Sequence, residues 1–239
     1  MEIKAFIDNY QEAFGDQSQL PIAFWYSAQA QAQTEKVGGC IFKHLDRIAK
    51  GEMVSVDTDN IGCGGGKFYC GFSDMPEYVP QFVSVKERYK QSPELVVDML
   101  AELQVPRAKD NYLNFARVDC LASFQGVEGV LFLATPDILS GLVTWATFDR
   151  NEQDTVSSLF GSGCSNVITQ AVIENTVGGY RSFIGFFDPS VRPYVASDIL
   201  SFAIPMSRFR VMCDTMRQSC LFDTHAWGKI RERIIFGNT

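Results

Sequence analysis

The sequence contains few residues that could act as a general base, since only two of its 239 residues are histidines, His44 and His225. Nucleophilic catalysis by cysteine or serine usually depends on a histidine held beside the nucleophile. Neither histidine stands in a recognisable triad context. We therefore keep a thiol-dependent enzyme only as a third interpretation of this chain, and whether the protein is an enzyme stays open at this point.

The chain also lacks the features that direct a protein to a membrane or to nucleic acid. No segment approaches about eighteen consecutive apolar residues, so we expect no membrane-spanning helix. The first residues, MEIKAFIDNY, lack the basic and apolar regions of a secretory signal. A net charge of −7 without a basic run disfavours binding to nucleic acid or to an anionic membrane. We expect a soluble cytoplasmic protein.

Cysteine, by contrast, occurs seven times. In a chain without a secretory signal, these thiols fit a reducing compartment, where cysteine stays free or binds metal. The odd number also argues against a complete disulfide framework. The cysteines are Cys40, Cys63, Cys70, Cys120, Cys164, Cys213 and Cys220.

Helix and strand signals alternate along the whole chain. Apolar residues at helical spacing, with serine or threonine caps and prolines in first turns, predict helices. These cover residues 3–14, 40–50, 93–105, 136–146 and 166–172, with one or two more after residue 205. Short apolar runs predict strands at residues 22–26, 53–56, 115–121, 127–134, 155–160, 182–187 and 199–204. We expect an α+β (or α/β) protein, one compact domain over residues 1–239 with a mixed sheet flanked by helices.

The densest special chemistry lies in residues 61–72, IGCGGGKFYCGF, which hold five glycines. We expect a glycine-rich loop here, although a flexible hairpin tip with incidental cysteines is the plainer alternative. A nucleotide-binding P-loop would need glycine at position 61 and a hydroxyl at position 68, where Ile61 and Phe68 stand. The backbone of Gly62, Gly64, Gly65 and Gly66, with Lys67 as a point charge, could still bind an anionic ligand or cofactor. This possibility supports a second interpretation, a small-molecule binding or sensing module without catalysis.

Three cysteines share a glycine-rich setting: Cys40, Cys63 and Cys164. Cys40 and Cys164 fall at predicted helix starts, where the helix dipole favours a thiolate. Thiolates ligate zinc and iron–sulfur clusters, and adjacent glycines leave room for them. Our first interpretation is therefore a zinc or iron–sulfur protein with a redox role, whose redox partner is unknown.

The sequence does not decide which residue would be the fourth metal ligand. Cys70 is a further candidate, although it lies seven residues after Cys63, a wider spacing than compact metal sites use. His44 could ligate zinc, but a lone histidine at such a position is more often a surface residue. The remaining cysteines, Cys120, Cys213 and Cys220, are expected to be small buried hydrophobes.

Five stretches of the sequence match the landmarks of a known family. They are Leu20-Pro21-Ile22-Ala23-Phe24, Cys40-Ile41-Phe42-Lys43, Gly62-Cys63-Gly64-Gly65-Gly66 with Cys70-Gly71-Phe72, Thr135-Pro136-Asp137, and Phe160-Gly161-Ser162-Gly163-Cys164. With them, most of the chain resembles domain of unknown function family 169. The resemblance implies a fold and the positions of the site residues, but it does not imply a reaction.

The chain departs from that family's pattern at one place. Members often carry a further cysteine in a Gly-Cys pair after the next strand, whereas residues 184–188 here read IGFFD. If that cysteine is a ligand in its relatives, this protein uses another group or leaves the position open. The resemblance therefore implies a site of three thiolates rather than four.

Overall fold

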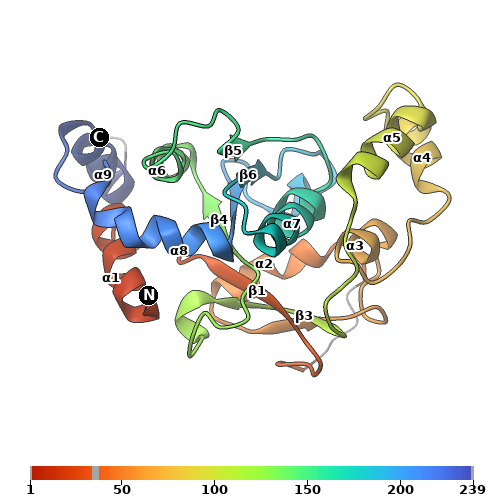
Figure 1. Ribbon diagram of the computed structural model, residues 1–239, viewed down its shortest axis with the longest axis horizontal. Coiled ribbons are helices and arrows are strands. Elements are labelled where there is room, and N and C mark those ends of the chain that lie inside the picture. The colour runs from red at the N-terminus through yellow and green to blue at the C-terminus, as the bar shows by residue number, and fades with distance from the viewer. Residues whose placement is uncertain (1, 34–37, 238–239) are drawn as a thin grey trace.

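A seven-stranded mixed sheet forms the centre of the computed structural model, which describes residues 2–33 and 38–237 (Figure 1). The strands lie in the order β2-β3-β1-β4-β7-β6-β5. Neighbouring strands are antiparallel except for β5 and β6, which are parallel. The strands are β1 (Ile22–Ser27), β2 (Val54–Val56), β3 (Tyr112–Arg117), β4 (Gly129–Ala134), β5 (Val156–Ser157), β6 (Ser182–Gly185) and β7 (Leu200–Pro205). The predicted α+β class with a mixed sheet flanked by helices is confirmed.

Successive side chains along the central strands lie alternately in two separate hydrophobic cores. In β1, Ile22 and Phe24 lie in one core and Ala23 lies in the other. In β7, Ala203 lies in the same core as Ile22 and Phe24, and Phe202 lies in the same core as Ala23. Successive residues of a strand point to opposite faces of the sheet, so both faces are buried and both need helices to cover them.

Four helices cover one face and enclose what we call the aromatic core. They are α1 (Ile3–Phe14), α6 (Pro136–Ala146), α8 (Met206–Thr215) and α9 (His225–Phe236). The ring of Phe209 lies at the centre, with its centroid 4.9 Å from Phe6 and 5.6 Å from Phe124. The indole N–H of Trp145 donates to the Met212 carbonyl at 2.8 Å, so its only polar atom is satisfied inside the core.

Shorter helical segments cover the opposite face and enclose what we call the thiol core. They are the 3₁₀ turn η1 (Ile41–His44), α2 (Leu45–Ala49), α3 (Gly64–Tyr69), the π-helical η4 (Ser165–Thr169) and α7 (Gln170–Val177). The predicted helix over residues 40–50 is therefore a 3₁₀ turn followed by a short α-helix. Cys70 and Cys164 are buried in this core, and Cys40 and Cys63 pack against it.

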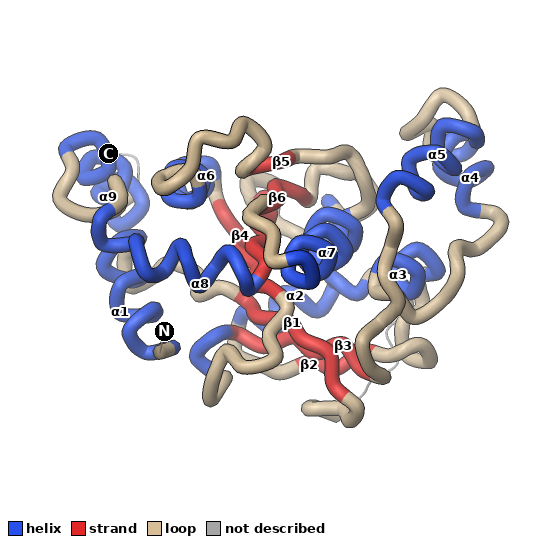
Figure 2. Tube along the Cα trace, in the orientation of Figure 1, coloured by secondary structure: helices blue, strands red, loops and turns tan. Residues whose placement is uncertain are grey.

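A helical excursion, residues 73–110, leaves the thiol face between α3 and β3 and projects away from the sheet (Figures 1 and 2). It contains α4 (Val79–Gln81), the π-helical η2 (Phe82–Lys86) and α5 (Pro93–Leu103). The α5 helix begins as predicted, with the Ser92 hydroxyl accepting the Leu95 N–H at 3.4 Å. Of its predicted apolar face, Val96 is buried and Leu100 and Leu103 pack against the thiol core, whereas Leu95 is 45% exposed.

The glycine-rich stretch departs most from the secondary structure that the sequence predicted. The first turn of α3 is formed by Gly64, Gly65 and Gly66. The prediction of an open glycine-rich loop here is therefore wrong. None of the three has a positive φ. A side chain on Gly64 would place its Cβ 2.7 Å from the Tyr78 hydroxyl, so the absence of a side chain there allows close packing.

Candidate thiol site

The fold brings four cysteines together from distant parts of the chain. Cys40 precedes η1, Cys63 and Cys70 lie at the two ends of α3, and Cys164 lies where the chain enters η4. The four thiols are close enough that the charges of the other three each raise the pKa of Cys164. The structure therefore places the three cysteines predicted as ligands, and the further candidate Cys70, near one another on the thiol face.

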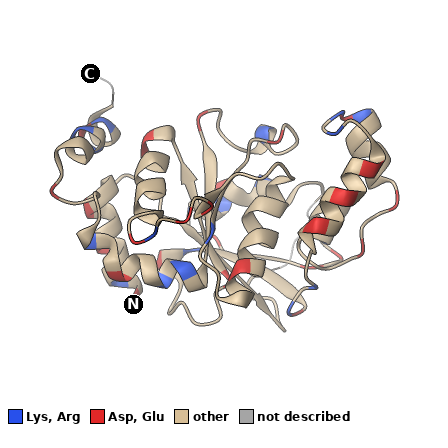
Figure 3. Cartoon of the chain, turned by 45° about the horizontal axis from the view of Figure 1, so that its top comes forward, with Lys and Arg blue, Asp and Glu red and all other residues tan. Residues whose placement is uncertain are grey.

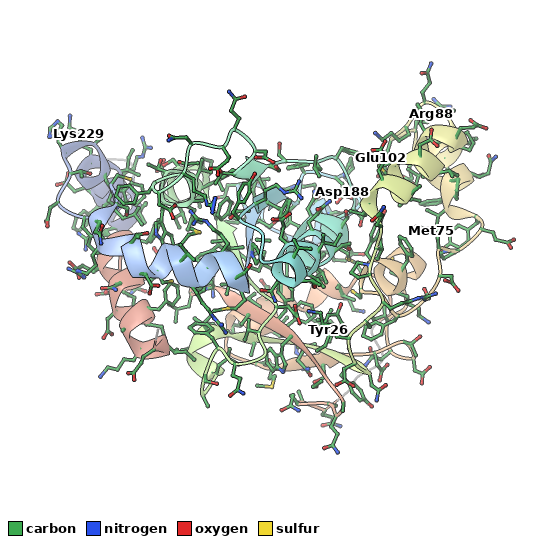
Figure 4. The ribbon with its side chains drawn as sticks, viewed as in Figure 1. Tyr26, Met75, Arg88, Glu102, Asp188 and Lys229 are labelled. Atoms are coloured by element: carbon green, nitrogen blue, oxygen red, sulfur yellow. The ribbon has the colours of Figure 1, made fainter. Side chains whose placement is uncertain are left out.

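Three consecutive carbonyls fix the end of α3 that carries Cys70. The Tyr69 carbonyl accepts the Thr169 hydroxyl at 2.7 Å, and the Cys70 carbonyl accepts the Tyr26 hydroxyl at 2.9 Å. The Gly71 carbonyl accepts the Ala108 N–H at 3.0 Å. Since these donors come from η4, from β1 and from the chain after α5, one short segment is held to three elements. Tyr26 is labelled in Figure 4.

Gly71 permits the closest backbone approach in this region. Its φ is +80°, and a Cβ there would lie 2.3 Å from the Ala108 nitrogen. A side chain therefore fits neither the conformation nor the space. The glycine lets the returning chain lie directly beside the cysteine that precedes it.

At the other end of α3, the sulfur of Cys63 accepts the Gly66 N–H at 3.3 Å. N–H bonds to sulfur are a regular feature of thiolate ligands in iron–sulfur proteins. Gly62 is exposed and Lys67 is half-buried beside this turn. An anion-binding role for Gly62, Gly64, Gly65, Gly66 and Lys67 stays a prediction.

Two of the four thiols, those of Cys40 and Cys164, hold their protons more firmly than the sequence indicated. Burial raises the pKa of the Cys40 thiol to about 11. A hydrogen bond with the Cys70 thiol, together with burial, raises the pKa of Cys164 well above its ordinary value. Burial and the neighbouring thiols therefore act against thiolates at Cys40 and Cys164, which is opposite to the effect expected of helix starts.

Asp188 adds a buried carboxylate beside the thiols, and the sequence did not reveal it. The side chain is 2% exposed and is labelled in Figure 4. Its Oδ1 accepts the Ser190 N–H at 3.0 Å, whereas its Oδ2 has no hydrogen-bond partner among the described residues. Its charge contributes to the raised pKa values of Cys40 and Tyr69. An aspartate after a strand is common, so only the φ of +67° at nearby Phe186 marks this segment as unusual.

The donor set suits a metal, but the donors are not already arranged around one point. Sulfur from four cysteines and oxygen from Asp188 are ligands that zinc and iron accept. Among the described residues, however, no three cysteine, histidine, aspartate or glutamate side chains are placed to hold an ion. Binding would have to draw the sulfurs together and remove their protons.

The two histidines and the other three cysteines differ in how far they are buried. His44 is buried rather than exposed as expected, whereas His225 is exposed at the start of α9, on the opposite face of the sheet. Cys120 is exposed, so its prediction as a buried hydrophobe is wrong. Cys213 and Cys220 are only half-buried, although both pack against the aromatic core as small apolar side chains.

A cavity of about 500 Å³, the α5 pocket, lies between α5 and the body of the protein. Tyr69 lines it and also adjoins the thiol site, because its hydroxyl hydrogen-bonds with Ser162 and the charges of Cys164 and Cys63 act on it. Burial is the largest cause that raises the pKa of Tyr69, to about 12. The pocket and the thiol site therefore share one wall.

Comparison with known proteins shows the family. The chain belongs to domain of unknown function family 169, described as "Uncharacterised ArCR", whose sequence model matches residues 17–215. The matched range contains the four cysteines of the site and Asp188. Neither the curated proteins nor the solved structures yielded a match to this chain. No described helix is long and apolar enough to cross a membrane.

Proposed function

We propose that this protein binds zinc or an iron–sulfur cluster through the thiolates of Cys40, Cys63 and Cys164, with Cys70 as the fourth candidate. The observation that carries the proposal is the meeting of these four thiols on one face of the sheet. Buried cysteines are common in proteins, but four of seven in one place are not explained by packing alone. An iron–sulfur cluster would give the protein a redox role, whereas zinc would not.

The surroundings of the thiols support a resident inorganic group. The Gly66 N–H on Cys63 would stabilise negative charge on a bound sulfur. The unpartnered Oδ2 of Asp188 is a buried polar atom without a hydrogen bond among the described residues, and such an atom calls for an explanation. A ligand to a bound cation would provide one.

Anaerobic purification followed by iron, sulfide and zinc analysis tests the proposal. We expect a stoichiometric metal in the wild-type protein, its loss in Cys63→Ser, and its retention in Cys120→Ser, which removes an exposed thiol outside the site. Wild-type protein that folds but stays metal-free after reconstitution with iron and sulfide, and with zinc, contradicts the proposal. Equal metal content in Cys63→Ser and wild type contradicts it as well.

The α5 pocket favours a second candidate function, a small-molecule binding or sensing module. Its volume of about 500 Å³ is in the usual range for small-ligand sites. Co-purification of an organic molecule, detected by native mass spectrometry, supports this candidate. Unchanged binding of that molecule by Cys63→Ser separates it from the metal proposal.

A further inference from the structure

The α5 pocket combines apolar walls with a few charges, and this combination limits what it can bind. One wall comes from the excursion, with Met99 and Leu103 of α5, and the other from the body, with Leu159 and Phe160. Phe160 is 40% exposed, and its ring meets the ring of Tyr89 edge-on, with 6.1 Å between their centroids. Apolar walls of this kind accept a flat or branched apolar group.

Two cations face the same cavity. Lys90 lies with its Nζ 5.6 Å from the centroid of Phe160, and it makes no ion pair within the described parts of the chain. Arg181 is anchored by Glu174, whose Oε1 accepts the Arg181 Nε at 2.8 Å. The Arg181 guanidinium bonds to Glu174 through Nε and Nη2, and its Nη1 makes no hydrogen bond within the described parts of the chain. Two cations therefore line this cavity in a protein of net charge −7.

One carboxylate also lines the pocket. Glu102 is the last of three acidic residues at four-residue spacing on α5, with Glu94 and Asp98, and Figure 3 shows the acidic side of this helix. No ion pair of Glu102 is found within residues 2–33 and 38–237. A ligand anion therefore belongs beside Lys90 and Arg181, and a hydrogen-bond donor on the ligand belongs beside Glu102.

We propose that the α5 pocket binds a small organic carboxylate with an apolar body and an amino or hydroxyl group, the carboxylate pairing with Lys90 and the donor with Glu102. The proposal rests on the second candidate function and gives it a ligand class. It does not depend on the thiol site, because no cysteine lines the pocket. The shared wall at Tyr69 would place such a ligand next to the thiols.

Calorimetric titration with four probes tests the ligand class: L-phenylalanine, phenyllactate, phenylacetate and phenethylamine. We expect the first two to bind most tightly, phenylacetate more weakly because it lacks the donor, and phenethylamine least because it lacks the carboxylate. Lys90→Gln should weaken the three carboxylates about tenfold, as expected for the loss of one charge-assisted contact. Lys86→Gln, which changes a lysine of the same excursion outside the pocket, should bind like wild type.

Glu102→Gln sharpens the assignment, because it should weaken L-phenylalanine more than phenylacetate. All titrations are repeated in Cys63→Ser, where the same affinities are expected, so a failed metal proposal leaves this test intact. The ligand class is contradicted if none of the carboxylates binds saturably, or if Lys90→Gln binds them as wild type does. Binding of phenethylamine alone would overturn the ligand class while leaving a small-molecule function standing.

Discussion

The two faces of the sheet differ in what their cores are made of. The aromatic core joins rings from α1, α6, α8 and α9, and its indole N–H groups bond to backbone carbonyls. The thiol core holds four cysteines, a buried carboxylate and a buried histidine under shorter helical segments. The same alternating strands supply both cores, so the difference lies in the covering segments. The first face also buries one charged side chain, Arg208 of α8, which pairs with Asp149. The second face carries four thiols and a carboxylate whose Oδ2 has no hydrogen-bond partner among the described residues.

The largest expected effect separates stability from site chemistry. Phe209→Ala removes a ring that contacts four other aromatic side chains in the aromatic core, and we expect it to lower the free energy of unfolding by about 3–5 kcal/mol. Urea denaturation measures this loss. Metal content per folded molecule should stay at the wild-type value. A cost below about 1 kcal/mol would show that this face is not a tightly packed core.

A smaller effect tests the attachment of the thiol face to the excursion. Gly71→Ala should cost about 2–5 kcal/mol, because its φ is +80° and its Cβ would strike the backbone of Ala108. Gly126→Ala is the matched control, since its φ is +76° but nothing lies within 4 Å of the added Cβ. We expect only about 1–2 kcal/mol there. Equal costs in thermal denaturation would contradict the close approach at Gly71.

Alkaline pH should weaken the fold through the buried thiols. The folded pKa of Cys40 is about 11 and that of Cys164 is raised as well, whereas an unfolded thiol titrates near pH 8.5. The unfolded chain therefore loses these protons first. The free energy of unfolding should be constant below about pH 8 and fall as the pH rises from about 8.5 to about 11.

Denaturation curves at several pH values check this expectation, and Cys40→Ser should flatten the slope. Burial also raises the pKa of Cys213, beside the aromatic core, so part of the slope should remain in that variant. Saturating zinc should remove the thiol-face part alone, because bound thiolates carry no proton. An unchanged slope in Cys40→Ser would contradict the assignment.

The fold was largely predictable from the sequence, because its signals are local. Helix α1 repeats apolar residues at helical spacing, and Ser92-Pro93 starts α5 as expected. The glycine-rich stretch was misjudged, since glycine usually breaks helices and here α3 is held by contacts to β1, η4 and the chain after α5.

The site was only partly predictable. Glycine next to cysteine marked Cys40, Cys63 and Cys164, and the structure brings them together. Asp188 and the high thiol pKa values depend on burial, which single-sequence patterns do not report.

The smallest expected effect is the order in which the thiols react with iodoacetamide. Cys120, the exposed cysteine, should be labelled first, Cys40 and Cys63 more slowly, and the buried Cys70 and Cys164 last. Mass mapping after timed quenching measures the order. Prior loading with zinc should protect Cys40 and Cys63 and leave Cys120 unchanged. Equal protection of Cys120 would point to general stabilisation rather than to binding at the thiol face.

The most direct test of the thiol site is X-ray absorption at the zinc edge of the zinc-loaded protein. We predict three or four sulfur neighbours at about 2.3 Å, and fewer sulfurs in Cys63→Ser. The Cys120→Ser variant should give the wild-type spectrum. A first shell of only nitrogen and oxygen at about 2.0–2.2 Å, unchanged in Cys63→Ser, would contradict a metal site built from these cysteines.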